Sequence, residues 1–164
     1  MRRLIVLGVV VAAAAVGVAI AVAATGGENA STVSVKQISG HGKLLVDAKG
    51  RALYRSEQER GGMVLCKGAC LSFWQPLTVA GAPTKSNSLV GKLGVVKRPD
   101  GRRQVTDNGR LLYSFKLDKP GHVTGDGFKD AFGGQKFTWH LVRPAGASSS
   151  SGTTTTMPAY TYPG

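Results

Sequence analysis

The side chains best suited to chemistry fall into two similar stretches of this 164-residue chain. Tyr113, Phe115 and Asp118 form a Tyr-x-aromatic-x-x-Asp motif. Earlier in the chain, Tyr54 and Glu59 repeat the spacing of its first and last members. These five residues could form a symmetric ligand site between two repeats, or a catalytic one. The simpler alternative is structural, with the rings in the core and Asp118 capping the turn that follows.

The two cysteines, Cys66 and Cys70, are the next candidates. An even number of cysteines in an exported chain predicts a disulfide. A bridge between them would close a very small ring, worth about 2 kcal/mol on the chain-entropy argument. Its expected use is local, holding a tight turn so that Phe73 and Trp74 can pack onto a sheet. A metal or haem role is the alternative, although neither a Cys-x-x-Cys-His nor a redox Cys-x-x-Cys spacing is present.

Other signatures of catalysis or metal binding are weak. His41, His122 and His140 stand singly in the sequence. Asp126 and Asp130 could bind a hard cation, but their surroundings lack a calcium-loop spacing. We find no nucleophile elbow, phosphate loop, zinc signature or paired carboxylates. We therefore expect no cofactor and no enzymatic activity. The alternative function is a metal- or haem-handling envelope protein that uses His, Met, Cys and Tyr side chains.

The elements that position these residues are predicted by an internal repeat. Residues 50–54 read Gly-Arg-Ala-Leu-Tyr and residues 109–113 read Gly-Arg-Leu-Leu-Tyr. A fixed internal offset indicates a duplicated supersecondary unit. Extended outward, the offset that matches Tyr54 with Tyr113 also matches Gly42 with Gly101 and Val46 with Val105.

Alternating apolar and polar residues between Gly-rich turns predict antiparallel strands around each copy. The expected strands are 33–36, 43–46 and 51–56 in the first copy, and 93–97, 104–106 and 110–116 in the second, followed by a last strand at 137–142. The predicted fold class is all-β: two tandem three-stranded meander repeats packed into one small domain, with an N-terminal hydrophobic helix and a disordered C-terminal tail.

Composition divides the chain into four parts. Residues 1–24 combine two arginines with an unbroken apolar run, which predicts a signal peptide or, if uncleaved, an N-terminal membrane anchor. Residues 25–32 form a spacer and residues 33–146 the duplicated β-meander domain. Residues 147–164 are a Ser/Thr-rich tail too polar to build a core. Either fate of the first part places the domain outside the cytoplasm.

The formal net charge is +12, which suggests an anionic neighbour. Outside the cytoplasm that partner would be a cell-wall polymer, a lipid surface or an envelope protein, and not a nucleic acid. The plainer alternative is that the charge only keeps the domain soluble, because no run of five basic residues occurs.

Three motifs together resemble a known family. Cys-x-x-x-Cys at 66–70, Trp-x-Pro-Leu at 74–77 and Tyr-x-aromatic-x-x-Asp at 113–118 are similar to the bacterial secreted-repeat family of unknown function, predicted lipoproteins with a Tyr-x-[Phe/Trp/Tyr]-x-x-Asp motif. The resemblance covers about residues 42–146 and implies an extracytoplasmic fold without an established activity. No lipid-attachment cysteine follows the apolar run. The predicted function is a non-catalytic cell-envelope or secreted module with a binding or structural role at the cell surface.

Overall fold

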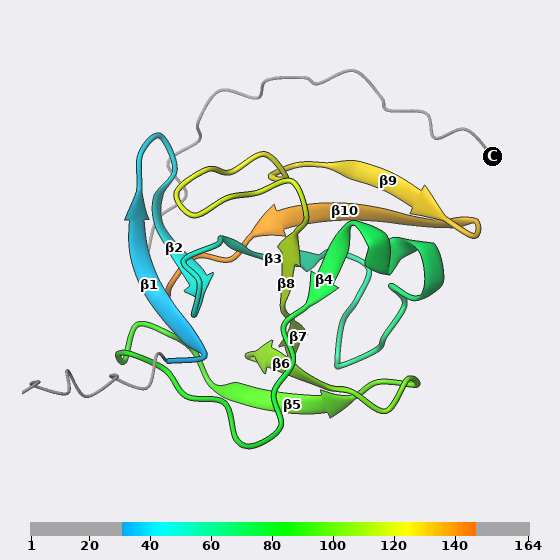
Figure 1. Ribbon diagram of the computed structural model, residues 1–164, viewed down its shortest axis with the longest axis horizontal. Helices are drawn as coiled ribbons and strands as arrows, with labels where there is room; N and C mark the ends of the chain where they lie inside the picture. The colour runs from blue at the N-terminus through cyan, green and yellow to red at the C-terminus, as the bar shows by residue number, and fades with distance from the viewer. Residues whose placement is uncertain (1–30, 147–164) are drawn as a thin grey trace, which may run out of the picture.

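The computed structural model describes residues 31–146, which fold into antiparallel strand ladders with one short helix at the edge of the domain (Figure 1). The elements in chain order are β1 (Val33–Ile38), β2 (Gly42–Asp47), β3 (Leu53–Ser56), the 3-10 helix η1 (Gly68–Ser72), β4 (Trp74–Pro76), β5 (Leu93–Lys97), β6 (Arg103–Asp107), β7 (Arg110–Leu111), β8 (Tyr113–Phe115), β9 (Lys129–Phe132) and β10 (Gln135–Leu141). The predicted all-β class is confirmed for this part of the chain. The predicted N-terminal helix and C-terminal tail lie outside the described residues. None of the helical structure within 31–146 is long and apolar enough to cross a membrane.

Two hairpins flank the central sheet. β1 pairs with β2 and β5 with β6, in registers that place Val33 opposite Asp47 and Leu93 opposite Asp107. The turn after β6 contains Asn108–Gly109, whose φ angles are 49° and 75°. Positive φ at both central positions is what a two-residue hairpin loop requires, so the strong hairpin signal in the sequence forms the predicted turn.

The central five-stranded sheet interleaves two parts of the chain. We call residues 33–77 the first segment and residues 93–142 the second segment. The strand order is β4-β8-β3-β10-β9, so β3 of the first segment lies between two strands of the second. Likewise β8 of the second segment lies between two strands of the first. Neither segment can therefore build the middle of this sheet alone.

The third strand of each predicted meander changes partner. Ala52 makes a single bridge to Val46, after which the chain enters the central sheet as β3. In the second segment β7 pairs with β6, and after Leu112 the chain continues in the central sheet as β8. The meanders are therefore shorter than expected, because each third strand leaves its own hairpin and pairs with the other segment.

The two hairpins align one position away from the alignment that the sequence repeat suggests. Asp47 and Asp107 occupy the same position in their registers. Three residues separate Asp47 from Arg51, whereas two separate Asp107 from Arg110, so the second turn is one residue shorter. Only after this turn does the alignment of Tyr54 with Tyr113 apply. The sequence matches of Gly42 with Gly101 and of Val46 with Val105 are therefore one residue out of register.

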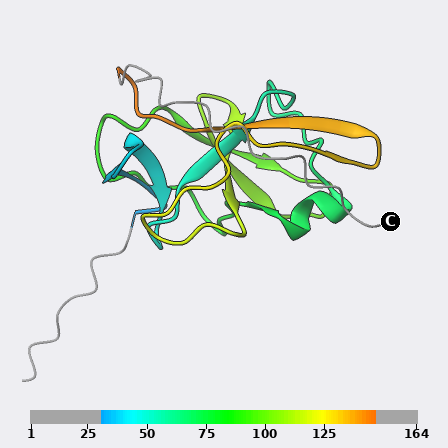
Figure 2. The ribbon, with the colours of Figure 1, turned by 90° about the horizontal axis from the view of Figure 1, so that it is seen from above.

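The core divides into two clusters on opposite faces of β3 and β8. Tyr54 and Tyr113 belong to an aromatic cluster, whereas the adjacent Leu53 and Leu112 belong to an aliphatic one, as the period-2 alternation of a strand requires. Burying each such side chain contributes roughly 1.5–3 kcal/mol. Seen from above, η1 and the β9–β10 hairpin lie at one end of the domain (Figure 2), where they extend the aromatic cluster.

Candidate functional site

The structure brings the five predicted site residues together in the core. The exposed fraction of their side chains is at most 5%: Tyr54 0%, Glu59 1%, Tyr113 0%, Phe115 2% and Asp118 5%. A ligand would have to displace their contacts with one another to reach them. Their role as a ligand site stays a prediction. In the structure they form two buried polar contacts between the segments, Tyr54 with Asp118 and Tyr113 with Glu59. We call each of these contacts, together with the loop amides that bond it, a joint.

The two tyrosines exchange carboxylate partners between the segments. The hydroxyl of Tyr54 donates to Oδ2 of Asp118 at 2.5 Å, and that of Tyr113 donates to Oε1 of Glu59 at 2.9 Å. The register of β3 and β8 places Tyr54 directly opposite Tyr113, which aims each ring toward the loop of the other segment. A tyrosine therefore bonds the acid of the other motif and not its own.

Asp118 organises the loop that follows it. Its Oδ1 accepts hydrogen bonds from the backbone N–H and the hydroxyl of Thr124, at 2.9 and 2.8 Å. The next amide, of Gly125, donates to the Tyr54 hydroxyl at 3.3 Å. A Cβ added to Gly125 would lie 2.9 Å from the Trp74 ring, so only glycine fits here. Asp118 is thus a loop cap, but the amide that it bonds is that of Thr124 and not one of the predicted turn at 119–121. Its third partner comes from the other segment.

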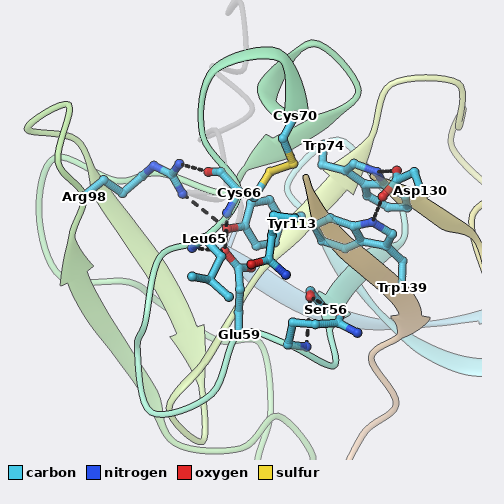
Figure 3. Close-up of a disulfide and its surroundings, with 12 residues drawn as sticks. Ser56, Glu59, Leu65, Cys66, Cys70, Trp74, Arg98, Tyr113, Asp130 and Trp139 are labelled. Atoms are coloured by element: carbon cyan, nitrogen blue, oxygen red, sulfur yellow. Dashed lines mark hydrogen bonds between the residues drawn. A yellow bond between two sulfur atoms is a disulfide. The ribbon is translucent and has the colours of Figure 1, made fainter. Parts of the chain in front are cut away.

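Glu59 holds the turn that carries the disulfide (Figure 3). Its Oε1 accepts the backbone N–H groups of Leu65 and Cys66, both at 2.8 Å. In the alignment of Tyr54 with Tyr113, these two amides correspond to the two that serve the other joint. Cys66 and Cys70 form the predicted disulfide, which closes this turn. The other carboxylate oxygen of Glu59, Oε2, is buried without a partner among the described residues.

Arg98 is a buried cation that sequence reasoning missed. Its exposed fraction is 2%, and its Nη2 donates to the Cys66 carbonyl at 2.6 Å. Its Nη1 donates to Oε1 of Gln104 and to the Tyr113 hydroxyl, the latter at 3.3 Å. In Figure 3 the Arg98 side chain extends toward Cys66 and Tyr113. Because Tyr113 in turn bonds Glu59, a chain of polar contacts connects the cation to the buried carboxylate.

The signal that could have found Arg98 lies in the corrected alignment of the hairpins. When Asp47 is matched with Asp107, Ile38 and Leu44 occupy the positions of Arg98 and Gln104. One segment therefore has an apolar pair where the other has a hydrogen-bonded polar pair. Both pairs are buried, so the difference is a repacking of the core at one joint only.

The environment keeps both tyrosine hydroxyls protonated. Burial raises the pKa of Tyr54 far above its ordinary value of 10, and the hydrogen bond to Asp118 raises it further. Burial also raises the pKa of Tyr113, and the charge of Glu59 raises it further, while Arg98 opposes the shift. Both phenols therefore act as donors at neutral pH, and neither is poised to serve as a base.

Two stacked indoles share one carboxylate beside these joints. The rings of Trp74 and Trp139 lie 3.9 Å apart at an interplanar angle of 11°. Their Nε1 atoms donate to the two oxygens of Asp130 at 2.7 and 3.0 Å. Burial raises the pKa of Asp130, while these two bonds oppose the shift. Asp130 is therefore engaged in the core, and the cation-binding alternative considered for it with Asp126 has no support here, since Asp126 accepts the Leu141 amide.

No group of three or more His, Cys, Asp and Glu side chains within residues 31–146 is arranged to hold a metal ion. The two cysteines of this part bond each other. His140 lies 2.7 Å from Glu57 at the surface. No observation in this part of the chain favours the metal- or haem-handling alternative.

The surface is much more basic than the composition suggests. In the described residues 15 of 19 Lys and Arg side chains are exposed, but only 3 of 8 Asp and Glu side chains, namely Glu57, Asp100 and Asp126. The others are buried or half-buried. Four of these five cap loops, accept indole N–H groups or pair with arginine, and the fifth, Asp107, is buried against Gly91. Folding thus withdraws carboxylates from the surface and leaves cations on it.

Comparison with known proteins confirms the resemblance seen in the sequence. A family model described as a secreted repeat of unknown function matches residues 94–142, from β5 to just beyond β10. The match includes Tyr113, Asp118 and Trp139. Searches of curated proteins and of solved structures gave no match. The similarity to a secreted repeat indicates an extracytoplasmic location.

Proposed function

We propose that residues 33–146 form a duplicated, non-catalytic module of the cell envelope that binds an anionic polymer or lipid surface. Residues 1–24 would export it and, if uncleaved, attach it to the membrane. The similarity to a secreted repeat supports the location. The burial of the motif residues supports a structural role for them, because their hydroxyls and carboxylates are bonded to each other and to loop amides.

The symmetry of the central sheet supports the duplication. β4 lies against β8 with Trp74 opposite Phe115 and Pro76 opposite Tyr113. β10 lies against β3 in the matching register, pairing Trp139 with Ser56, His140 with Arg55 and Leu141 with Tyr54. A tryptophan starts each pairing, Trp74 in one and Trp139 in the other. The two tyrosines occupy equivalent positions on either side of an approximate two-fold axis. An ancestral unit that was doubled accounts for both arrangements.

The observation that carries the binding proposal is the charge asymmetry of the surface. The exposed side chains of residues 31–146 include 15 basic and 3 acidic groups. Such a surface attracts polyanions over a distance of about a Debye length, roughly 10 Å at 0.1 M salt. In the envelope the available polyanions are wall polymers and anionic lipid headgroups. No cleft or catalytic constellation has to be assumed for this kind of binding.

The test is a co-sedimentation series with the exported chain. Vesicles of phosphatidylglycerol, vesicles of phosphatidylcholine and purified cell-wall sacculi are each mixed with the protein at increasing salt. We expect binding to the anionic vesicles or the sacculi that weakens as salt rises, and little binding to phosphatidylcholine. Binding that is absent at low salt, or that does not respond to salt, would contradict the proposal.

A further inference from the structure

One arginine of the first segment is neutralised by a carboxylate beside it. Arg51 donates from Nε to Oδ2 of Asp47 at 2.9 Å, and its Nη2 lies 2.8 Å from the same oxygen. Its Nη1 donates to Gln75 at 3.2 Å. Each of the three nitrogens of this guanidinium therefore has a partner within the protein.

The equivalent arginine of the second segment is not neutralised. Arg110 pairs with Asp107 in the β6–β7 register, yet these two residues form no ion pair. The Asp107 carboxyl group lies against the backbone of Gly91, where an added Cβ would be 2.3 Å from Oδ1. Both Oδ1 of Asp107 and Nε of Arg110 are buried without a partner among the described residues. The Arg110 side chain is held instead by Nη2, which donates to the Ser56 carbonyl at 2.6 Å.

Two further arginines surround this unneutralised guanidinium. Arg60 is held by the next carbonyl of the chain, with its Nε donating to the Glu57 carbonyl at 3.1 Å. Arg55 precedes the carbonyl that holds Arg110. Burial lowers the pKa of Arg110, and the charges of Arg55 and Arg60 lower it further, against the opposing charges of Glu57 and Glu59. At the positions equivalent to Arg55 and Arg60, the other joint has Ser114 and Lys119.

The nearby acids do not satisfy this cluster. The Glu57 carboxylate is 2.7 Å from the His140 imidazole, and Glu59 is buried against the Tyr113 hydroxyl. Three guanidinium groups therefore share one part of the surface, and none of them forms a side-chain ion pair among the described residues. The remaining acid, Asp107, is buried, which raises its pKa, and the charge of Arg55 only opposes that shift. Like charges this close disfavour one another, and a bound anion would relieve that repulsion.

We propose that Arg55, Arg60 and Arg110 form a binding site for a phosphate group, carried by a wall polymer or a lipid headgroup. The inference rests on the proposed function and gives it a location and a chemistry. A guanidinium offers five N–H donors in a planar fork that matches the oxygens of phosphate. The carbonyl contacts of Arg110 and Arg60 use one nitrogen each and Nε of Arg110 is buried, which leaves Nη1 of Arg110 and the two terminal nitrogens of Arg60 for the ligand. The first segment has an Arg51–Asp47 ion pair, whereas Arg110 forms no such pair. This difference makes the Arg110 guanidinium available to a ligand.

The site is tested with the full exported chain, using inorganic phosphate in calorimetric titrations and phosphatidylglycerol vesicles in co-sedimentation. The variants are Arg110→Gln, Arg110→Lys and Arg55→Gln. The control is Lys136→Gln, which removes the same charge from an exposed position on β10. Melting temperatures check folding. Arg55 has an exposed side chain, so its variant serves even if the Arg110 variants unfold.

We expect wild type and Lys136→Gln to bind phosphate within about twofold of each other, and Arg55→Gln and Arg110→Gln to bind at least about tenfold more weakly. Arg110→Lys should also lose affinity because it keeps the charge but not the fork. Salt-dependent vesicle binding that all variants retain equally would overturn the phosphate site and leave the proposed function standing. If the variants lose phosphate binding but the wild type binds neither vesicles nor sacculi, the proposed function would be overturned and the phosphate site would stand. Absence of both would overturn both.

Discussion

The Tyr54 hydroxyl bonds Asp118, 64 residues further along the chain, at 2.5 Å. Its counterpart bond, from Tyr113 to Glu59, runs in the opposite direction between the same two segments at 2.9 Å. The Tyr-x-aromatic-x-x-Asp motif therefore does not close on itself. The tyrosine of each copy donates its hydroxyl to the acid of the other copy. That acid also accepts amides of the loop that follows it, so the two copies hold each other reciprocally.

Removing one hydroxyl should destabilise the domain measurably. Tyr54→Phe and Tyr113→Phe should each lower the free energy of unfolding by about 1–3 kcal/mol, because each leaves a buried carboxylate short of a partner. Urea unfolding measures the effect. Double-mutant cycles provide the control: Tyr54→Phe should couple to Asp118→Asn more strongly than to Glu59→Gln. Equal coupling to both acids would contradict the exchange of partners.

Alkaline pH should destabilise the domain through the same two tyrosines. Their pKa values are raised in the folded state by burial first, so above about pH 10 the unfolded chain loses their protons while the folded chain keeps them. The contribution of the tyrosines to the free energy of unfolding is therefore fully present below that pH. Above it, the free energy of unfolding falls by up to about 1.4 kcal/mol per pH unit for each tyrosine. Urea unfolding across this range should show a shallower decline in the double variant Tyr54→Phe/Tyr113→Phe. An identical decline would refute the assignment.

The polar pair at one joint should be exchangeable for the apolar pair at the other. Arg98→Ile alone should cost about 3 kcal/mol or more, because it strands the Cys66 carbonyl and the Gln104 amide. Adding Gln104→Leu, which recreates the Ile38 and Leu44 arrangement, should recover about 1–3 kcal/mol relative to additivity. Thermal or urea unfolding of both single variants and the double variant tests this. Strict additivity would mean that the two positions are not equivalent to the apolar pair.

The disulfide should contribute only modestly to stability. Its sequence separation is 4 residues, which corresponds to about 2 kcal/mol on the chain-entropy argument. The double variant Cys66→Ala/Cys70→Ala should lose about this much in urea unfolding and should no longer respond to a reductant. Free thiols in the exported wild type would contradict both the bridge and the location.

The sequence was sufficient for the first strands of each meander, for the last strand and for the disulfide, because alternation and turn residues report which face of a strand is apolar. It did not predict β4 or β9, and it gave β7 and β8 as one strand. It could not give the interleaved sheet, since alternation says nothing about which strand lies alongside. The turn that is one residue shorter after Asp107 misplaced the alignment of the hairpins. Arg98 resembled any basic residue near a Pro-Asp-Gly turn, and its burial depends on a carbonyl 32 residues earlier.

The same reasoning explains why the surface cluster was missed. Arg55, Arg60 and Arg110 are scattered in the sequence, and Arg110 looks equivalent to Arg51. Only the structure shows that one of these two arginines has a carboxylate partner and the other does not. The difference depends on the direction in which the buried carboxyl group of Asp107 points, which no local sequence pattern indicates.

The most direct test of the reciprocal joint is to cut the chain between Asn87 and Ser88, two exposed loop residues, and to study residues 31–87 and 88–146 separately and mixed. Because β3 and β8 each find their sheet neighbours in the other segment, each fragment alone should lack near-ultraviolet circular dichroism and dispersed amide resonances. An equimolar mixture should recover both signals as a one-to-one complex. A native-like spectrum from either fragment alone would contradict the account.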